Sequence, residues 1–289
     1  MTWESDSPAE EKSISPLGWL RVGVRAVLLA LLVFGGLALL LALRLFERPL
    51  FGLNRPWTPY VTQVVCRGAF VILGVEHRAE GSQMKNAGAV VANHSSWLDI
   101  FTLNARKRVY FVSKSEVARW PGIGWLARAT GTVFIKRDPR EAKLQQEIFE
   151  ARLLAGHKLL FFPEGTSTDG LRVLPFKPTL FQAFFAKPLR DRLFVQPVTV
   201  VYEAPFGETA RFYGWWGDMD FGSHLLKTLS AGRGGRVTVK YHTPLRVADF
   251  SDRKALAKAA EAAVRKGMPT GFSGVAKAYD AQRLPTHKS

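Results

Sequence analysis

An uninterrupted apolar stretch near the start of the chain limits what this protein can fold into. From Ala26 to Leu43 the sequence reads AVLLALLVFGGLALLLAL, 18 residues without a charge. At a rise of about 1.5 Å per residue, a helix of this length just crosses a hydrocarbon core of about 30 Å. Arg21 and Arg25 precede the run, and Arg44 and Arg48 follow it, as expected of side chains that reach two headgroup layers. The run therefore predicts a membrane anchor helix.

Two other interpretations of the run stay open. A buried core helix is rarely apolar all round over five turns, and a cleaved signal peptide needs a small-residue cleavage site, which the following FERPLFG lacks. The next apolar stretch, 60–75, is interrupted by Gln63 and Arg67. This second stretch predicts an interfacial or packed helix rather than a second span.

Charge is distributed unevenly along the chain. The 289 residues include 40 Lys and Arg against 24 Asp and Glu, a formal net charge of +16, yet residues 1–20 sum to −3. The remainder therefore carries about +19, which favours an anionic partner such as phospholipid headgroups or an acidic carrier protein. Without a zinc finger, an aromatic RNA-binding signature or a basic zipper, nucleic acid is not expected. A single cysteine, Cys66, excludes an intrachain disulfide, and the histidine spacing indicates no metal site.

Beyond about Arg78, short β-rich runs alternate with amphipathic stretches, which predicts an α/β fold with a mostly parallel sheet flanked by helices. The expected strands are 89–93, 109–113, 132–136, 158–163, 193–202 and 236–245. The expected helices lie near 97–104, 115–129, 139–155 and 176–187. A last helix is expected to open at Ser251 and to close at Gly267.

The segment NHSSWLD follows the expected strand 89–93 and contains a histidine and an aspartate five residues apart. On one continuous helix His94 and Asp99 would lie about 140° apart, so they meet only if the chain turns first. Ser96 as an N-cap would produce that turn, and Asp99 would then fix the tautomer of a histidine base. The same residues also form an ordinary capping box, in which Asp99 accepts only from backbone N–H groups.

Three further segments carry groups suited to binding. FFPEGTSTDG (161–170) places small and hydroxylated residues after an apolar strand, where backbone N–H groups can converge on an anion; Glu164 could instead hold a hydroxyl-bearing substrate or brace the histidine loop. GTVFIKR (131–137) ends a strand in two bases, of which Arg137 is the better bidentate ligand for phosphate or carboxylate. Pro197 within 193–202 predicts a bulge or an edge position.

Together these segments resemble the glycerolipid (1-acylglycerol-3-phosphate type) acyltransferase family. The resemblance rests on four blocks in order: His94 and Asp99 with four residues between them, G-x-x-F-I-x-R at 131–137, FPEGT at 162–166 and QPV at 196–198. It covers roughly residues 75–245. An apolar anchor before the first block also fits the membrane-bound members of that family.

The resemblance implies a fold with the histidine–aspartate pair at the mouth of an acyl-chain tunnel. His94 would be the general base on the acceptor hydroxyl, and Asp99 would orient its ring. The acyl donor would be acyl-carrier protein or acyl-CoA, with no other cofactor and no acyl-enzyme intermediate. The substrate-binding residues implied are Arg137, Glu164, Gly165, Thr166 and Ser167.

The chain also departs from the phosphatidic-acid branch, where the third block commonly continues EGTRS. Here Ser167 stands in place of that arginine, and EGTSTDG together with WWGDMDFGSHL (215–225) looks more like the bacterial lyso-ornithine lipid O-acyltransferase branch. The expected acceptor is therefore the hydroxyl of a lyso-ornithine-type aminolipid. The alternative is lysophosphatidic acid, or both acceptors.

Two other classes are set against this one: a non-catalytic membrane-binding module and a serine hydrolase using Ser95 or Ser96. The chain has no G-x-S-x-G elbow. The expected organisation is a polar acidic tail (1–18), a membrane anchor helix with its linker (19–58), an acyltransferase domain (59–267) and a polar C-terminal tail (268–289). The protein is expected at the bacterial inner membrane, single-pass or monotopic, with its catalytic domain on the cytoplasmic side.

Overall fold

A computed structural model describes residues 3, 5, 13–136, 140, 142–232 and 234–270. The described strands form one sheet in the order β1-β7-β6-β2-β5-β3-β4, with β8 beside β6. Their bounds are β1 Glu76–Glu80, β2 Gly88–Ala92, β3 Tyr110–Lys114, β4 Val133–Ile135, β5 Leu159–Phe161, β6 Phe194–Glu203, β7 Arg236–Tyr241 and β8 Leu245–Arg246. Neighbouring strands are parallel except where β7 and β8 meet β6. The α/β fold with a mostly parallel sheet is confirmed.

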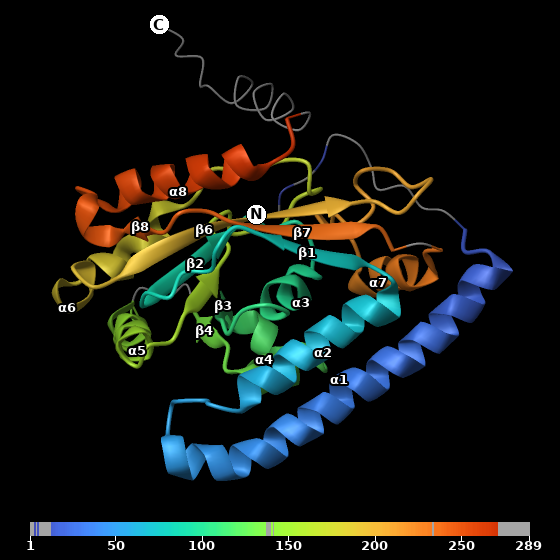
Figure 1. The fold of residues 1–289 in the computed structure, drawn as a ribbon, viewed down its shortest axis with the longest axis horizontal. Coiled ribbons are helices and arrows are strands. Elements are labelled where there is room, and N and C mark those ends of the chain that lie inside the picture. Colours follow the sequence, from blue (N-terminus) through green and yellow to red (C-terminus); the bar gives the residue numbers. More distant parts are fainter. Residues whose placement is uncertain are drawn as a thin grey trace, which may run out of the picture.

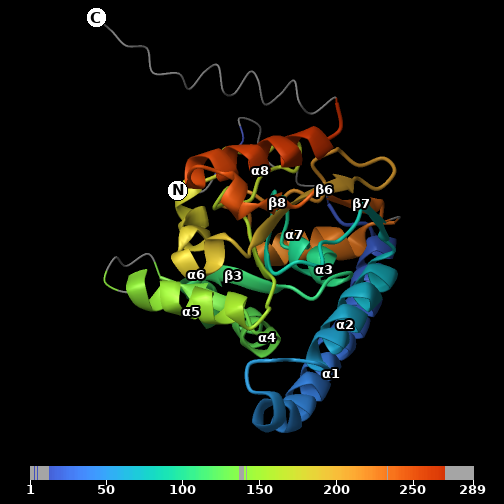
Figure 2. The same ribbon diagram turned by 60° about the vertical axis from the view of Figure 1, so that its left-hand side comes forward.

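Helices cover both faces of this sheet. They are α1 Pro16–Phe51, α2 Thr58–Leu73, α3 Asp99–Asn104, α4 Ile123–Thr130, α5 Ala142–Leu154, α6 Lys187–Arg190, α7 Phe221–Ser230 and α8 Arg253–Gly267, with 3₁₀ turns η1 Ser115–Arg119, η3 Pro178–Phe185 and η4 Val247–Asp249. Figures 1 and 2 show α8 on one face and α1, α2, α3 and α7 on the other. Two buried apolar clusters, one on each face, therefore form the core.

The apolar run lies inside a helix twice its length. Ser15 caps the helix by accepting from the backbone N–H of Gly18 at 3.1 Å, and α1 then continues for 36 residues, about 54 Å, to its C-cap Gly52. The following apolar stretch forms α2, which packs antiparallel against α1 (Figure 1). Most large apolar side chains of α1 remain exposed, so this helix is long and apolar enough to enter a membrane. The membrane helix predicted within 19–58 is thus matched by a candidate, and the packed helix at 60–75 is present.

The arginines beside the apolar run contact protein rather than pointing away from it. The Nη1 atom of Arg25 donates to the carbonyls of Leu229 and Ala231 at 2.9 and 2.7 Å, at the end of α7. The Nη2 atom of Arg44 donates to the carbonyl of Gly52 at 2.7 Å. Both residues donate to carbonyls at helix ends, and the expectation that the arginines reach headgroups stays a prediction. Arg25 thereby attaches α1 to the end of α7, whereas Arg44 closes the C-terminal end of α1 itself.

Several expected helix boundaries were wrong. The last helix is capped by Asp252, whose Oδ1 accepts from the N–H groups of Lys254 and Ala255, not by Ser251. Gly267 is the final helical residue rather than the cap, and a Cβ there would collide with the Thr199 side chain. The expected helices 115–129 and 176–187 each contain a 3₁₀ turn and a shorter α-helix, because glycine or proline interrupts the helical run.

The expectation of a bulge or edge position at Pro197 is not met. Pro197 is buried in β6, a central strand, opposite Val91 of β2. On the other side of β6, the segment that joins β7 to β8 interrupts the regular strand pairing. There the Pro197 carbonyl accepts from the N–H of His242 at 3.0 Å. A proline is tolerated here because this interruption removes the need for its missing donor.

Candidate active site

The loop that carries the histidine is fixed where β2 ends. Asn93 is fully buried, and its side chain donates to the carbonyl of Val200 at 2.9 Å and accepts from the N–H of Val200 at 2.8 Å. This amide continues the pairing of β2 with β6 for one residue after the strand. His94 therefore lies just beyond the carboxyl end of β2, between two parallel neighbours, at the sheet edge where α/β proteins bind their ligands.

His94 and Asp99 meet as the sequence predicted. The Nδ1 atom of His94 lies 2.8 Å from Oδ2 of Asp99, which is fully buried, whereas the His94 side chain is 20% exposed. A carboxylate accepts only, so Nδ1 carries the hydrogen and Nε2 holds the lone pair. Nε2 makes no hydrogen bond to any residue of the described chain. This geometry suits a histidine that takes a proton through Nε2.

Asp99 also organises the loop, because it accepts from backbone N–H groups as well as from the imidazole. Its Oδ2 accepts from the N–H groups of Ser95 and Ser96 at 2.8 and 3.0 Å. Ser96 accepts from the N–H of Leu98 at 3.3 Å, and α3 begins at Asp99 itself rather than two residues earlier. The turn expected from Ser96 is present, with the helix starting later than predicted.

The second oxygen of Asp99 has a partner that the sequence did not indicate. The hydroxyl of Tyr202, at the end of β6, donates to Oδ1 of Asp99 at 2.7 Å and lies 2.9 Å from Oγ1 of Thr102. Burial and the adjacent carboxylate raise the pKa of Tyr202, so the hydroxyl stays protonated and keeps donating. Both carboxylate oxygens of Asp99 therefore accept hydrogen bonds, and these bonds fix the orientation of the carboxylate.

Residues 161–170 support the histidine from the neighbouring strand β5. The Phe162 ring stacks on the imidazole, with centroids 4.0 Å apart and planes 8° from parallel. Glu164 is 2% exposed; its Oε1 accepts from the N–H of His94 and its Oε2 from the N–H of Leu174, both at 2.7 Å. Burial raises the pKa of Glu164 to about 8. Of the two roles considered for Glu164, bracing the histidine loop is the one these contacts describe, and its role in substrate binding stays a prediction.

The other expected binding residues follow in the same loop. Gly165 has φ +74°, and Gly165, Thr166 and Ser167 are all partly exposed. The N–H of the next residue, Thr168, donates to the carbonyl of His94 at 3.0 Å. The loop is therefore bonded to His94 on both sides. Arg137 lies outside the described residues, although β4 ends at the same edge of the sheet.

The N-terminal tail reaches this loop. Trp3 is 6% exposed, contacts Trp216 edge-on with centroids 6.4 Å apart, and lies under the Arg172 guanidinium at 4.7 Å. Its backbone N–H is 3.4 Å from Oγ1 of Thr166, and its carbonyl accepts from Gly217 at 3.1 Å. The segment expected to be a polar acidic tail thus contains one buried aromatic residue, Trp3, which its acidic composition did not indicate.

The segment 215–225 closes the other side of the histidine loop. The Trp97 indole donates to Nδ1 of His224 at 2.9 Å, and Nε2 of His224 faces the carbonyl of Gly214 at 2.9 Å. Burial lowers the pKa of His224 to about 4, so its neutral ring bridges the two groups. The N–H of Trp215 donates to the carbonyl of Ser95 at 2.9 Å. His224 is therefore a structural histidine that holds the loop.

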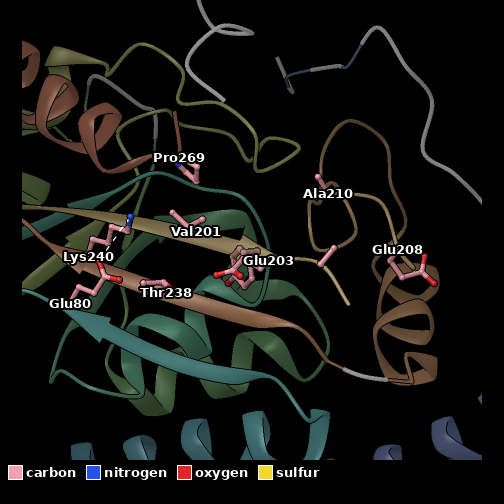
Figure 3. A pocket seen from close by; sticks show the side chains of 10 residues that line it. Glu80, Val201, Glu203, Glu208, Ala210, Thr238, Lys240 and Pro269 are labelled. Carbon is pink, nitrogen blue, oxygen red and sulfur yellow. Dashed lines mark ion pairs between the residues drawn. The ribbon is translucent and has the colours of Figure 1, made fainter. Parts of the chain in front are cut away.

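The QPV block does not reach the dyad. Gln196 is fully buried near the start of β6, where its amide bonds to the carbonyls of Ser82 and His242 and accepts from Met84 and Lys107. A groove of about 570 Å³ lies on the opposite face of β6, lined by Val201 and other residues (Figure 3). Tyr202 points its hydroxyl away from it toward Asp99. The acyl-chain tunnel beside His94 stays a prediction.

Comparison with known proteins shows the family of this chain. The Acyltransferase family profile matches residues 75–201, which contain the dyad and the loop 161–170. A lyso-ornithine lipid O-acyltransferase from Rhodobacter capsulatus is 59% identical over 266 residues, covering 92% of this chain and 96% of its own. A protein of the same name from Brucella abortus is 34% identical over 84% of this chain and 95% of its own. The chain belongs to the acyltransferase family, and it is an acyltransferase.

More distant relatives share the fold and part of the sequence. A 1-acyl-sn-glycerol-3-phosphate acyltransferase from Neisseria gonorrhoeae is 38% identical over 121 residues, 40% of this chain and 47% of its own. The crystal structure of a 1-acyl-sn-glycerophosphate acyltransferase from Thermotoga maritima superposes with a TM-score of 0.60 at 22% identity, over 90% of this chain and 95% of that one. This second likeness establishes the fold.

Proposed function

We propose that the protein transfers a fatty acyl group from an acyl thioester to the hydroxyl of a lyso-ornithine-type lipid. One observation carries the proposal: the His94–Asp99 pair, at 2.8 Å, stands in a chain 59% identical to a lyso-ornithine lipid O-acyltransferase over nearly its whole length. Ser167, where an arginine is common in the phosphatidic-acid branch, supports the same acceptor. Lysophosphatidic acid is the second candidate, favoured by the Neisseria and Thermotoga relatives.

In the proposed reaction Nε2 of His94 takes the proton of the acceptor hydroxyl as its oxygen attacks the thioester carbonyl. The C–O bond forms, the C–S bond breaks, and the leaving thiolate takes the proton from the imidazolium. Asp99 stabilises the positive charge that the ring carries between these two transfers, as an acceptor at Nδ1 does in other histidine-base sites. No covalent acyl-enzyme is required.

Neither serine of the loop is proposed as a nucleophile. Ser95 and Ser96 are 1% and 0% exposed. The Ser95 hydroxyl accepts from the Asn93 amide at 3.3 Å, and the Ser96 hydroxyl accepts from the N–H of Leu98. An activated serine needs its own base within hydrogen-bond reach, and the imidazole here is directed to Asp99 instead.

The proposed donor is acyl-carrier protein or acyl-CoA, and no other cofactor is proposed. A chain of net charge +16 attracts either of these anionic donors, and the attraction weakens as salt is added. The proposed substrates, a lyso-lipid and a fatty acyl group, both place the reaction at a membrane surface.

We propose that α1 lies in the membrane interface, on the cytoplasmic side of the inner membrane, rather than spanning it. Arg25 joins one end of the helix to the end of α7. At the other end Glu47 accepts from the N–H and hydroxyl of Thr58, the first residue of α2, at 3.1 and 2.7 Å, and Arg55 of the linker donates to the carbonyl of Ala129 in α4 at 2.6 Å. A spanning helix about 54 Å long could not keep both attachments without drawing the polar catalytic domain into the bilayer.

The proposal is tested with the purified full-length protein in mixed micelles, supplied with acyl-carrier protein thioester and each lyso-acceptor. The wild type should form ornithine lipid, and His94→Ala should lower kcat by about 10³-fold or more, because the acceptor loses its base. His242→Ala, on the α8 side of the sheet, serves as the matched histidine control and should stay active. Unchanged turnover in His94→Ala would contradict the mechanism, and product from lysophosphatidic acid alone would support the second candidate.

A further inference from the structure

The side chain of Lys177 folds back over the turn that carries Glu164 and Gly165. The backbone N–H of Lys177 donates to the carbonyl of Pro163 at 3.0 Å, which holds its Cα beside the turn. Its Nζ lies 2.5 Å from the position that a Cβ would occupy on Gly165, and its Cδ and Cε lie at 3.3 Å. The ammonium therefore occupies the space that a glycine at 165 leaves open.

This ammonium is not neutralised by its surroundings. Lys177 is exposed, and among the described residues its Nζ forms no hydrogen bond or ion pair. The carboxyl of Glu164, in the same turn, is directed inward to two backbone N–H groups. Burial also raises the pKa of Glu164 to about 8, so this group contributes little negative charge near pH 7. The turn thus presents a positive charge to solvent.

The backbone that carries Lys177 is joined to the loop that holds the imidazole. Glu164 holds the N–H of His94 at 2.7 Å, and Thr168 holds its carbonyl at 3.0 Å. Lys177 is attached to the same turn through Pro163. A ligand that binds the ammonium would therefore lie beside the turn that holds His94, where it could orient the reacting hydroxyl.

We propose that Lys177 binds the oxyanion of the acceptor headgroup and supplies the cation that Ser167 does not. The inference rests on the proposed function, since it assigns a binding residue to the acceptor of that reaction. The oxyanion is a carboxylate in an ornithine-type acceptor and a phosphate in lysophosphatidic acid. Both accept charge-assisted hydrogen bonds from an ammonium.

The test compares Lys177→Gln and Lys177→Arg with the wild type, using full-length protein and lyso-ornithine lipid in mixed micelles. Loss of one charge-assisted hydrogen bond should raise the acceptor KM about 10- to 100-fold in Lys177→Gln, with kcat and the donor KM within about twofold. Lys177→Arg keeps the charge and should recover most of the affinity. Lys187→Gln, an exposed lysine of α6 ten residues further on, is the matched control and should behave as wild type.

A modified acceptor identifies the group that Lys177 binds. Methyl esterification of the lyso-ornithine carboxylate should raise the wild-type KM by a similar factor and should add nothing in Lys177→Gln, because the two changes remove one interaction. If the phosphate is the natural oxyanion, the Lys177→Gln penalty appears with lysophosphatidic acid instead, which also supports the inference.

Two results would overturn it. Equal acceptor KM values in wild type and Lys177→Gln for both acceptors would remove Lys177 from the site while leaving the proposed function intact. A wild-type enzyme that acylates neither lyso-lipid would overturn the proposed function and this inference together.

Discussion

Two buried carboxylates hold His94, and they act on different parts of it. Asp99 is fully buried and accepts from the imidazole Nδ1, whereas Glu164 is 2% exposed and accepts from the backbone N–H of the same residue. Asp99 is therefore placed to stabilise a positive charge on the ring, whereas Glu164 holds the backbone that positions the ring. Both carboxylates are buried and both contact His94, so what distinguishes the one that we propose as catalytic is that it accepts from the imidazole ring.

The largest effect is expected when Asp99 is replaced by Asn. The amide either turns its NH2 group toward Nδ1, which favours the wrong tautomer, or turns its oxygen there without the negative charge that stabilises the imidazolium. In both cases kcat should fall by about 10³- to 10⁴-fold with little change in KM. Steady-state kinetics of the purified variant measure this loss. Circular dichroism provides the control for folding, and a folded Asp99→Asn enzyme with near wild-type kcat would show that the carboxylate serves the loop only.

Replacing Glu164 by Gln should have a smaller effect, mainly on stability. The amide nitrogen cannot accept a hydrogen bond, so the N–H of either His94 or Leu174 loses its partner. The free energy of unfolding should fall by about 1–3 kcal/mol. A decrease in kcat of about tenfold should accompany the displaced loop. Chemical denaturation in micelles checks the first value, with Glu80→Gln, an exposed carboxylate, as control.

The same variant should change how stability depends on pH. The pKa of Glu164 is about 8 in the folded protein against an ordinary value of 4.5, so between these values the folded state keeps a proton that the unfolded state has released. This group's contribution to stability is complete below about pH 4.5 and is lost as the pH rises through 8. The stability gap between wild type and Glu164→Gln should therefore narrow from pH 5 to pH 8. Parallel pH curves would show that Glu164 is ionised in the folded state throughout.

The smallest effect is expected for Tyr202→Phe. Removing the hydroxyl deprives Oδ1 of Asp99 of one donor, which should lower kcat about three- to tenfold, equivalent to a single hydrogen bond. Tyr213→Phe is the matched control, since Tyr213 lies beside Tyr202 and its buried hydroxyl has no hydrogen-bond partner in the described chain. Equal losses in the two variants would assign the effect to packing rather than to Asp99.

Local patterns predicted the elements well where one physical preference dominated. The charge-free run predicted a helix because an apolar helix satisfies its own backbone, and alternating β-rich runs predicted the parallel sheet. Prediction failed at Ser251 and Pro197, for different reasons. Ser251 and Asp252 are both good caps, so composition alone does not choose between them, and in the structure it is Asp252 that accepts from the helix N–H groups. Pro197 is acceptable in a central strand only because β7 and β8 leave a gap beside it.

The sequence alone predicted the pair to which we assign the chemistry, since His94 and Asp99 lie five residues apart and one tight turn brings them together. The tertiary structure decided everything that joins distant segments. Tyr202 reaches Asp99 because β6 pairs with β2, Glu164 reaches His94 because β5 pairs with β2 on its other side, and Lys177 folds onto the same turn. Strand order is a property of the whole packed core, so no local pattern could specify these contacts.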